Sequence, residues 1–238
     1  MTPFEEEIRS RGHWWIVIHP VDYVPQRLPL TELEQVLQRA RVQLRGWDFP
    51  HVSDRDPITT RMKSITGRTD WMYYRELWRF YQSGQFAYLL GIHEDWIERT
   101  DPGSFGARWG PPPGLAAQGP LLGVGDALFR ITETFEFASR LAVTPAGGEA
   151  MQIKIEVHGL KGRRLWVDSH HRLPPMEHEY VADITTFPYE DQFTTAELAA
   201  NGRELAATTT LELFARFDWR PPIEMMREEQ QELRWAAR

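Results

Sequence analysis

The sequence predicts an α+β fold, in which one or more largely antiparallel sheets pack with about four helices in a single compact domain, residues 1–238. Two patterns lead to this prediction. Some stretches carry apolar residues at helical spacing, whereas others are short apolar runs bounded by glycine, proline or polar residues, which are typical of strands. Their order is strand, helix, several strands, helix, three strands and two helices, with no clear linker between them. A chain of this length buries roughly 70% of its surface on folding, which suffices for one large core.

The first predicted elements are a buried strand and an amphipathic helix. Residues 14–18, WWIVI, form a short run of β-branched and aromatic residues that a proline soon closes. A helix is expected from about residue 30 to Gly46, and Thr31 and Glu34 have the spacing of a capping box. Six apolar residues repeat at helical spacing within it: Leu30, Leu33, Val36, Leu37, Ala40 and Leu44.

Three strands are expected next, and the last two should form a hairpin. The strands are residues 61–71, 73–82 and 85–96. A two-residue turn at Ser83 and Gly84 would place Arg79 opposite Tyr88. Both faces of this hairpin are apolar, so the sheet should be covered on both sides by helices, by a second sheet or by another subunit.

The rest of the chain is expected to contribute a loop, three helices and three strands. The loop is the exposed proline- and glycine-rich segment at about 101–120. The helices are residues 121–142, 194–217 and 222–236, and the strands are residues 152–160, 163–169 and 179–189. The apolar stripe of the helix that begins near residue 121 should lie on the sheet. Thr194 and Glu197 form a second capping box, at the start of the next helix.

The composition disfavours several classes of function. The chain has no cysteine, which excludes disulfides, thiolate nucleophiles and cysteine-ligated metals and makes a cytoplasmic location the expectation. Its net charge of −7 disfavours nonspecific binding to a nucleic-acid backbone. The acidic N-terminus does not resemble a signal peptide, and no apolar run approaches the roughly 20 residues needed to cross a bilayer, so no membrane contact is expected.

The stretch RGWDFPH, which begins at Arg45, is the main candidate for a site and has two interpretations. In the structural interpretation, Trp47 and Phe49 seal a seam between helix and sheet, while Asp48 caps a turn at the following proline. In the functional interpretation, Arg45, Asp48 and His51 border a pocket, where Arg45 holds an anion and His51 titrates near neutral pH. The sequence leaves both interpretations open.

A second candidate surface lies in the predicted hairpin. Arg79, flanked by Tyr81 and Tyr88, either stacks on them within the fold or offers a platform for a nucleic-acid base. The candidate residues for binding a ligand or partner are therefore Arg45, Trp47, Asp48, His51, Trp78, Arg79, Tyr81 and Tyr88.

No catalytic or metal-binding set of residues is complete in the sequence, and no cofactor is expected. His170, His171 and His178 lie in a proline-containing segment, and their spacing fits no metal motif. The segment GVGD, which ends at Asp126, is better explained as a helix start than as a phosphate-binding turn, because Asp126 would repel an anion. His93 lacks the second histidine of a zinc-protease motif.

Four stretches resemble a known family. They are PFEEEIRSRGHWWIVIHP, RGWDFPH, ELWRFYQSGQF and LELFARFDW. Together they resemble a bacterial domain of unknown function, which occurs alone or attached behind a Schlafen/AlbA-type ATP-binding domain. The resemblance implies a cytoplasmic partner or sensor module with a regulatory role in signalling or defence. This chain lacks a glycine-rich phosphate loop, so no ATP-binding role transfers to it.

We expect a noncatalytic interaction or sensor module that associates with a protein partner or with itself, nucleic acid being a less favoured partner. One alternative is a metal-dependent enzyme acting on nucleic acid or nucleotides, in which Asp48, Glu76 and Asp95 surround a divalent ion. Another alternative is a module that binds a small anionic ligand near Arg45 and His51.

Overall fold

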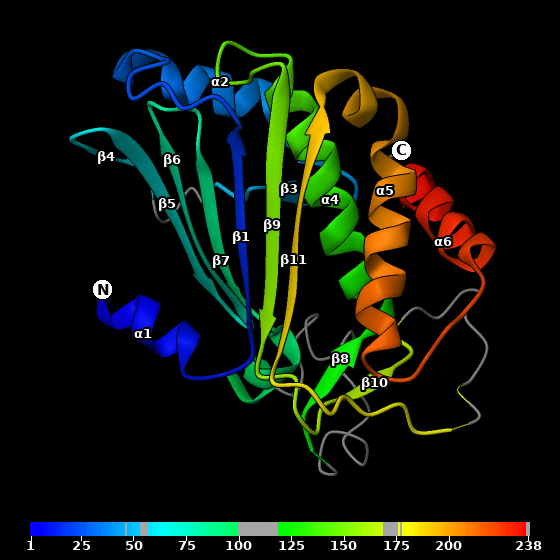
Figure 1. The fold of residues 1–238 in the computed structure, drawn as a ribbon. Helices are drawn as coiled ribbons and strands as arrows, with labels where there is room; N and C mark the ends of the chain where they lie inside the picture. The colour runs from blue at the N-terminus through cyan, green and yellow to red at the C-terminus, as the bar shows by residue number, and fades with distance from the viewer. Residues whose placement is uncertain (46, 53–56, 100–118, 169–175, 177, 237–238) are drawn as a thin grey trace.

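The computed structural model describes residues 1–45, 47–52, 57–99, 119–168, 176 and 178–236 (Figure 1). The loop expected at 101–120 falls almost wholly outside this part of the chain, as do His170 and His171. The described residues form an α+β fold, which confirms the predicted class. Among the described helices, none combines the length and the hydropathy that a bilayer-spanning segment requires.

Seven strands form one antiparallel sheet in the order β11-β9-β1-β7-β6-β5-β4. They are β1 (His13–Pro20), β4 (Thr59–Arg61), β5 (Ser64–Trp71), β6 (Tyr74–Tyr81), β7 (Phe86–Gly91), β9 (Ala150–His158) and β11 (Thr186–Thr194). β1 pairs with β7 on one side and with β9 on the other, so it joins the two halves of the chain. Both edges resist further pairing, because β4 is short and β11 carries Pro188 and the exposed residues Glu190 and Asp191.

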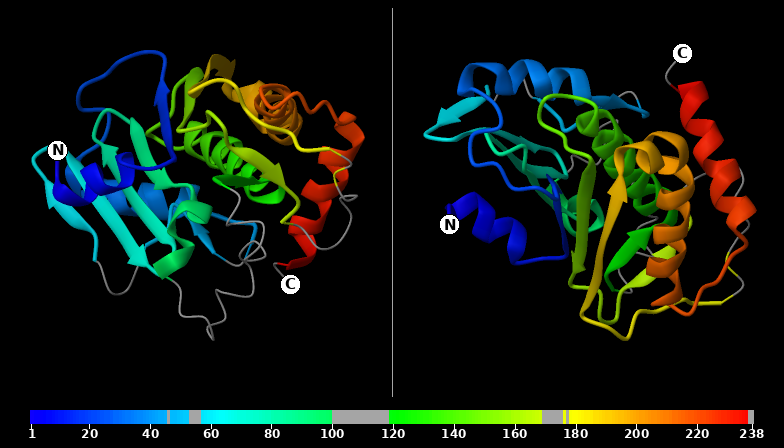
Figure 2. Two further views of the ribbon diagram at one scale, coloured as in Figure 1. Left: turned by 90° about the horizontal axis from the view of Figure 1, so that it is seen from below. Right: turned by 45° about the horizontal axis from the view of Figure 1, so that its top comes forward.

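The described part of the chain contains five α-helices. They are α1 (Pro3–Arg9), α2 (Leu33–Ala40), α4 (Val124–Ala142), α5 (Thr195–Ala215) and α6 (Ile223–Ala236). α4 packs on the sheet against β1 and β9, α5 packs on α4 and β11, and α6 lies against α4 and α5. Figure 2 shows α5 and α6 on the side of α4 that faces away from β5 and β6. Gln230 of α6 donates a hydrogen bond to Thr132 Oγ1 of α4 at 2.9 Å, which fixes the outermost helix.

Short elements connect the sheet to α4. They are the 3-10 helices η1 (Leu30–Glu32) and η2 (His93–Arg99) and the strands β2 (Val42–Gln43), β3 (Asp48–Phe49), β8 (Leu121–Gly123) and β10 (Arg164–Trp166). β2 and β3 pair with each other and contact α4, while β8 pairs with β10 and continues directly into α4. The N-terminal end of α4 is therefore a meeting point for distant parts of the chain.

The inner face of the sheet forms the main core. Trp14, Ile16 and Ile18 of β1 alternate toward it and are fully buried, as expected for a strand whose side chains alternate between faces. α4 contributes its apolar stripe to the same core, including Leu128, Ile131, Phe135, Ala138 and Leu141. Each large apolar side chain stabilises the fold by about 1.5 to 3 kcal/mol through burial. The prediction that this helix lies on the sheet is confirmed.

The outer face of the sheet is covered by α1, over β7 and its neighbours. Phe4 and Ile8 of α1 pack with Leu89 of β7. The ring of Phe4 also lies between two guanidinium groups, 4.0 Å from that of Arg68 and 4.8 Å from that of Arg75. On the outward face of β1, His13 is buried, whereas Trp15, Val17 and His19 are only half-buried. Both faces of the sheet were expected to be covered. On the outer face this holds for the region around β7, where α1 packs.

The hairpin between β6 and β7 has a longer turn than a two-residue one. Phe80 pairs with Phe86, and the Tyr81 N–H donates to the Gln85 carbonyl at 2.9 Å. Three residues form the loop, and Gly84 has a φ of +85°, as in three-residue hairpins that end in a left-handed glycine. The expected register was thus wrong by one residue, so every cross-strand pairing of the hairpin shifts. Arg79 faces Ala87, and Trp78 faces Tyr88.

Several predicted boundaries also needed correction. The helix expected from residue 30 to Gly46 ends at Ala40, because the chain then turns into β2 to pair with β3. The Thr31–Glu34 capping box does not form, since α2 follows η1 without a side-chain cap. The strand expected at 85–96 ends at Gly91 and gives way to η2, and the strand expected at 179–189 is the later β11. The Thr194–Glu197 capping box is confirmed at the start of α5.

Candidate functional site

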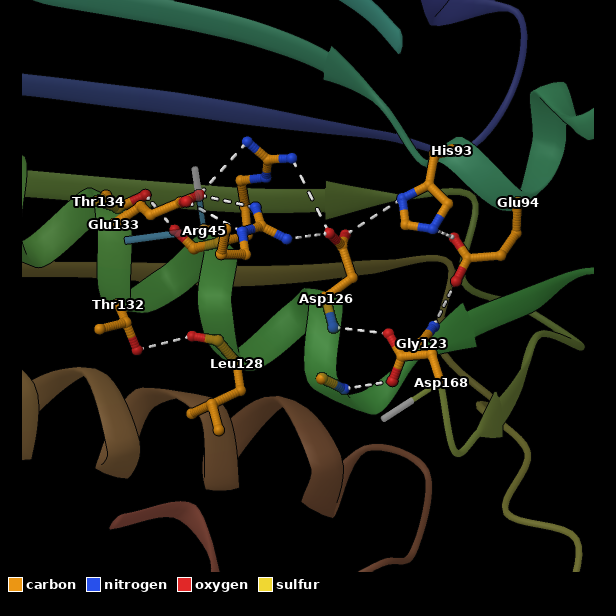
Figure 3. A network of polar contacts seen from close by, with 12 residues as sticks. Arg45, His93, Glu94, Gly123, Asp126, Leu128, Thr132, Glu133, Thr134 and Asp168 are labelled. Atoms are coloured by element: carbon orange, nitrogen blue, oxygen red, sulfur yellow. Dashed lines mark hydrogen bonds and ion pairs between the residues drawn. The ribbon is translucent and has the colours of Figure 1, made fainter. Parts of the chain in front are cut away.

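Five chain segments converge at the N-terminal end of α4, and Figure 3 shows those that contribute Arg45, His93, Asp126 and Asp168. The connection between β2 and β3 contributes Arg45 and Trp47. The turn from β5 to β6 contributes Trp71 to Tyr74, and η2 contributes His93 and its neighbour Glu94. The first turn of α4 contributes Asp126, and the chain after β10 contributes Asp168. Functional groups that cluster in this way are the best candidate for a site among the described residues.

Arg45 is the centre of an ion network that ties the β2–β3 connection to α4. Its Nε and one terminal nitrogen donate to the two Glu133 oxygens at 3.0 and 2.8 Å, and its other terminal nitrogen donates to Asp126 Oδ1 at 2.7 Å. Burial by itself would lower the pKa of Arg45, but the charges of Glu133 and Asp126 raise it well above its usual value. The guanidinium therefore stays charged, and two carboxylates already neutralise it.

His93 continues the network toward the end of the sheet. Its Nδ1 lies 3.5 Å from Asp126 Oδ2, and its Nε2 lies 3.6 Å from Glu94 Oε2. Burial opposes the charged imidazolium, yet the adjacent Glu94 and Asp126 carboxylates raise the pKa of His93 to about 9. The imidazole is therefore protonated at neutral pH, and the same interactions hold the pKa of Asp126 well below its usual value despite burial.

Two further carboxyl groups bind the backbone where α4 begins. Asp168 accepts hydrogen bonds from the Gly125 and Asp126 amides at 2.6 and 2.8 Å. Glu94 Oε1 accepts one from the Gly123 amide at 2.6 Å and one from the Trp166 indole at 2.9 Å. These bonds satisfy amide groups that the first helical turn leaves without intrahelical partners.

The two capping carboxyl groups face each other across Gly123. A Cβ atom on this glycine would lie 2.3 Å from Asp168 Oδ2 and 2.8 Å from Glu94 Oε1, so no larger residue fits without a shift. Burial, followed by the negative charges of Glu94 and Asp126, raises the pKa of Asp168 to about 7. Crowded carboxylates disfavour full ionisation, as expected for like charges in a buried site.

The network extends inward to a fully buried carboxyl group on β6. Glu76 has no exposed surface, and burial raises its pKa, although the Arg130 guanidinium and the Tyr88 hydroxyl beside it act in the opposite direction. Arg130 in turn lies 3.6 Å from a Glu133 oxygen and 3.9 Å from an Asp126 oxygen. A continuous line of charged groups therefore runs along the interface between the sheet and α4.

Next to this network lies a set of aromatic rings, here called the aromatic cluster, which consists of Trp47, His51, Trp71, Tyr73 and Tyr74. Trp47 stacks on His51 with ring centroids 3.9 Å apart and 19° between the planes. Tyr74 also stacks on Trp47, with ring centroids 4.9 Å apart and 15° between the planes. Trp71 does the same at 5.6 Å and 8°. Tyr73 joins the cluster to the ion network, since its ring lies 4.6 Å from Tyr74 and 5.4 Å from His93.

Three candidate residues from RGWDFPH lie at this site, and a fourth does not. Arg45 belongs to the ion network, while Trp47 and His51 belong to the aromatic cluster. Asp48 points elsewhere and forms an ion pair with Arg41 at 2.6 Å. Phe49 was expected to seal a seam between helix and sheet. It is buried in the core between Tyr88 and Phe137. The stretch is thus partly core and partly site.

The hairpin candidates do not form one surface. Trp78 and Tyr88 are buried on the inner face, where the Trp78 indole donates to the His51 carbonyl at 2.7 Å. Arg79 is exposed on the outer face, with its guanidinium carbon 6.0 Å from the Tyr81 ring centre. The Arg79 contact is therefore with Tyr81 and not with Tyr88, as the corrected register requires.

The sequence reasoning missed most of the site. It singled out neither Glu133 nor Asp168 nor the turn from Trp71 to Tyr74, because each lies far along the chain from RGWDFPH. The segment GVGD offered one usable signal, since glycines at a helix start free the backbone amides for an acceptor. In the structure those amides bind the carboxylates of Asp168 and Glu94 from the chain itself.

The acidic residues of the enzyme alternative lie apart and have other partners. Asp48 pairs with Arg41, Glu76 lies in the core, and Asp95 accepts two hydrogen bonds from Arg163 at 2.8 and 2.6 Å. Within the part of the chain that the structure describes, no group of three or more histidine, aspartate or glutamate side chains is arranged to hold a metal ion.

Comparison with known proteins gave no match to a family model, to a curated protein or to a solved structure. The fold and the site thus define an α+β protein in which aromatic rings lie beside a buried ion network at the start of a central helix.

Proposed function

We propose that this chain is a noncatalytic interaction or sensor module, and that its ligand or partner binds at the aromatic cluster. The observation that supports this most directly is the exposure of Trp71. Its side chain is 41% exposed although its ring stacks within an ordered set of aromatic rings. A large, rigid aromatic side chain that keeps one surface open is typical of a binding anchor, because little entropy is lost when it engages a partner.

The state of the neighbouring charged groups supports binding over catalysis. Asp126, His93 and Glu133 are held in ion pairs, and Asp168 and Glu94 cap the start of α4. A general acid or base needs to reach a substrate proton, whereas these groups already hold partners within the protein. Arg45 is likewise committed to two carboxylates, which argues against the alternative of an anionic ligand at this residue.

The proposal also covers the cellular location and the biological role of the module. We place the module in the cytoplasm because a chain without cysteine suits a reducing compartment. A regulatory role in bacterial signalling or defence follows from the resemblance to the domain that accompanies Schlafen/AlbA-type proteins. Association with a protein partner, or with a second copy of the chain, belongs to the same proposal.

The test is a comparison of two aromatic substitutions. Trp71→Ala removes the exposed ring of the aromatic cluster, and Tyr23→Ala removes a 76% exposed ring outside it. Thermal-shift screening against a metabolite collection, with light scattering to follow self-association, should reveal binding or assembly that Trp71→Ala loses and Tyr23→Ala keeps. If neither a ligand nor an assembly depends on Trp71, the proposal fails.

A further inference from the structure

The turn next to Trp71 has a strained backbone. Met72, directly after it, has a φ of +52°, a left-handed conformation that is costly for a residue with a large side chain. Tyr73, the next residue, is 9% exposed and packs against Tyr74 and His93, which holds the turn in place. Strain of this kind persists where the surrounding structure over-determines it, and it is concentrated at functional sites.

The rings behind Trp71 fix its orientation. Trp71 is nearly parallel to Trp47 and to Tyr74, with 8° between the planes in both cases. Trp47 and Tyr74 are only partly exposed, so the most accessible part of this stack is Trp71 itself. A flat ring that stacks on Trp71 would extend an arrangement that already exists, and no side chain would need to be reordered for it.

The overall charge of the chain favours a cationic ligand over an anionic one. The ion network next to the aromatic cluster is nearly balanced, because the carboxyl groups of Asp126, Glu133 and Glu94 face the cationic groups of Arg45, Arg130 and His93, and the pKa of Asp168 is raised to about 7. Asp126 and Arg45 act on the pKa of Tyr73 and of Tyr74 in opposite directions, so the charges of the network largely oppose each other at the aromatic cluster. The whole chain carries a net charge of −7. A positive charge on the ligand is therefore attracted, and a phosphate group is repelled.

We propose that Trp71 and the rings behind it form a binding site for a planar, cationic nitrogen heterocycle, such as an N-methylated nucleobase without a phosphate group. This inference rests on the proposed function and names its ligand class. The tryptophan face attracts cations more strongly than other aromatic faces do. A flat heteroaromatic ring adds stacking contacts, and the negative net charge of the chain adds long-range attraction.

The experiment compares three probes that share one ring system. 1-Methyladenosine carries a positive charge on the ring, adenosine carries none, and adenosine monophosphate adds a negative phosphate. Calorimetric titration of the full chain at low salt should give the tightest binding for 1-methyladenosine. Adenosine should bind about fivefold more weakly, as expected from one exposed cation–π contact. The monophosphate should bind more weakly still.

Substitutions of Trp71 distinguish specific binding at this site from nonspecific binding elsewhere on the surface. Trp71→Ala should abolish binding of 1-methyladenosine, Trp71→Phe should weaken it, and Tyr23→Ala should leave it unchanged. Thermal melting of each free variant checks that the fold is intact, and Trp71→Phe keeps the test valid if the alanine variant unfolds.

Three outcomes would overturn the inference. They are an absence of 1-methyladenosine binding, a preference for the monophosphate, and tighter binding of a single-stranded oligonucleotide than of the nucleoside. If the heterocycles fail but the metabolite screen finds another ligand that depends on Trp71, this inference falls and the proposed function stands. If nothing depends on Trp71, both fall.

Discussion

Replacing Asp168 with asparagine tests how the crowded carboxyl groups affect stability. Asp168 caps the first turn of α4 through two amide hydrogen bonds, while the nearby charges of Glu94 and Asp126 oppose its ionisation. Asparagine is nearly the same shape, keeps one side-chain oxygen as a cap and carries no charge at any pH. Asp168→Asn therefore removes the repulsion and, like the protonated Asp168 carboxyl group, keeps a good acceptor for only one of the two amides.

The expected magnitude follows from the pKa of Asp168. Burial and the neighbouring carboxylates raise this pKa from 3.8 to about 7, and each unit corresponds to about 1.4 kcal/mol. Because the folded-state pKa is the higher one, the stabilising contribution of Asp168 is fully present below pH 3.8 and is lost as the pH rises through about 7. Above that pH the ionised group costs up to about 4 kcal/mol, and the asparagine variant avoids this cost.

The assay is urea denaturation of both proteins between pH 4 and about 8.5, from which the difference in the free energy of unfolding is taken at each pH. The difference should be small near pH 4 and should grow to several kcal/mol in favour of Asp168→Asn at the upper end. Asp126→Asn is the matched comparison, and its effect on the free energy of unfolding should have the opposite sign, because the pKa of Asp126 is held well below its usual value. Removal of that charge should destabilise the protein at neutral pH. A pH-independent difference for Asp168→Asn, or a less stable variant at pH 8, would refute the reasoning.

Three further predictions concern the same region, and a fourth substitution, Gly202→Ala in α5, serves as a control for one of them. Glu133→Gln leaves the Arg45 guanidinium with one fewer carboxylate in a buried network, so it should lower the free energy of unfolding by about 3 kcal/mol in urea. Gly123→Ala forces a Cβ toward two carboxyl oxygens and should cost about 1 to 3 kcal/mol. Gly202→Ala in α5, where the nearest atom is 3.9 Å away, should instead stabilise by about 0.5 to 1 kcal/mol; equal effects of the two glycine changes would contradict the geometry. His93 has its pKa raised to about 9, so its stabilisation is lost as the pH rises through that value, and His93→Gln should remove this dependence from melting curves recorded between about pH 6.5 and 9.

Local patterns predicted those elements whose stability comes from their own residues. The run WWIVI became the centre of β1, because a short apolar stretch of β-branched and aromatic residues is buried on a sheet. The Thr194–Glu197 capping box formed, since both of its hydrogen bonds join residues three apart. The helix expected from residue 121 begins at Val124, three residues later, after a short strand that only tertiary pairing with β10 creates.

The errors arose where strand pairing or turn geometry decided the outcome against the local periodicity. The helical pattern around Leu44 was overridden because Val42 pairs with Phe49 in a small sheet. The hairpin register shifted because a glycine with positive φ gave the turn a third residue. Tertiary pairing outweighs a local preference worth only a few tenths of a kcal/mol per residue.

The candidate site, too, could be predicted only in part from the sequence. The sequence marked Arg45, Trp47 and His51 as unusual, and all three lie at the N-terminal end of α4. It did not distinguish an arginine free to hold an anion from one paired with Glu133 and Asp126. That distinction depends on residues more than eighty positions away along the chain.

By itself, the amino-acid sequence determined the α+β class, the absence of cysteine chemistry, the acidic charge and most of the long helices and strands, because these depend on composition and on short-range periodicity. Only the tertiary structure decided which charged side chains meet, which carboxyl groups hold protons near neutral pH and which tryptophan stays exposed. Those properties depend on distances of a few ångströms between residues that are remote in sequence, and on burial, which strengthens every charge interaction at such distances.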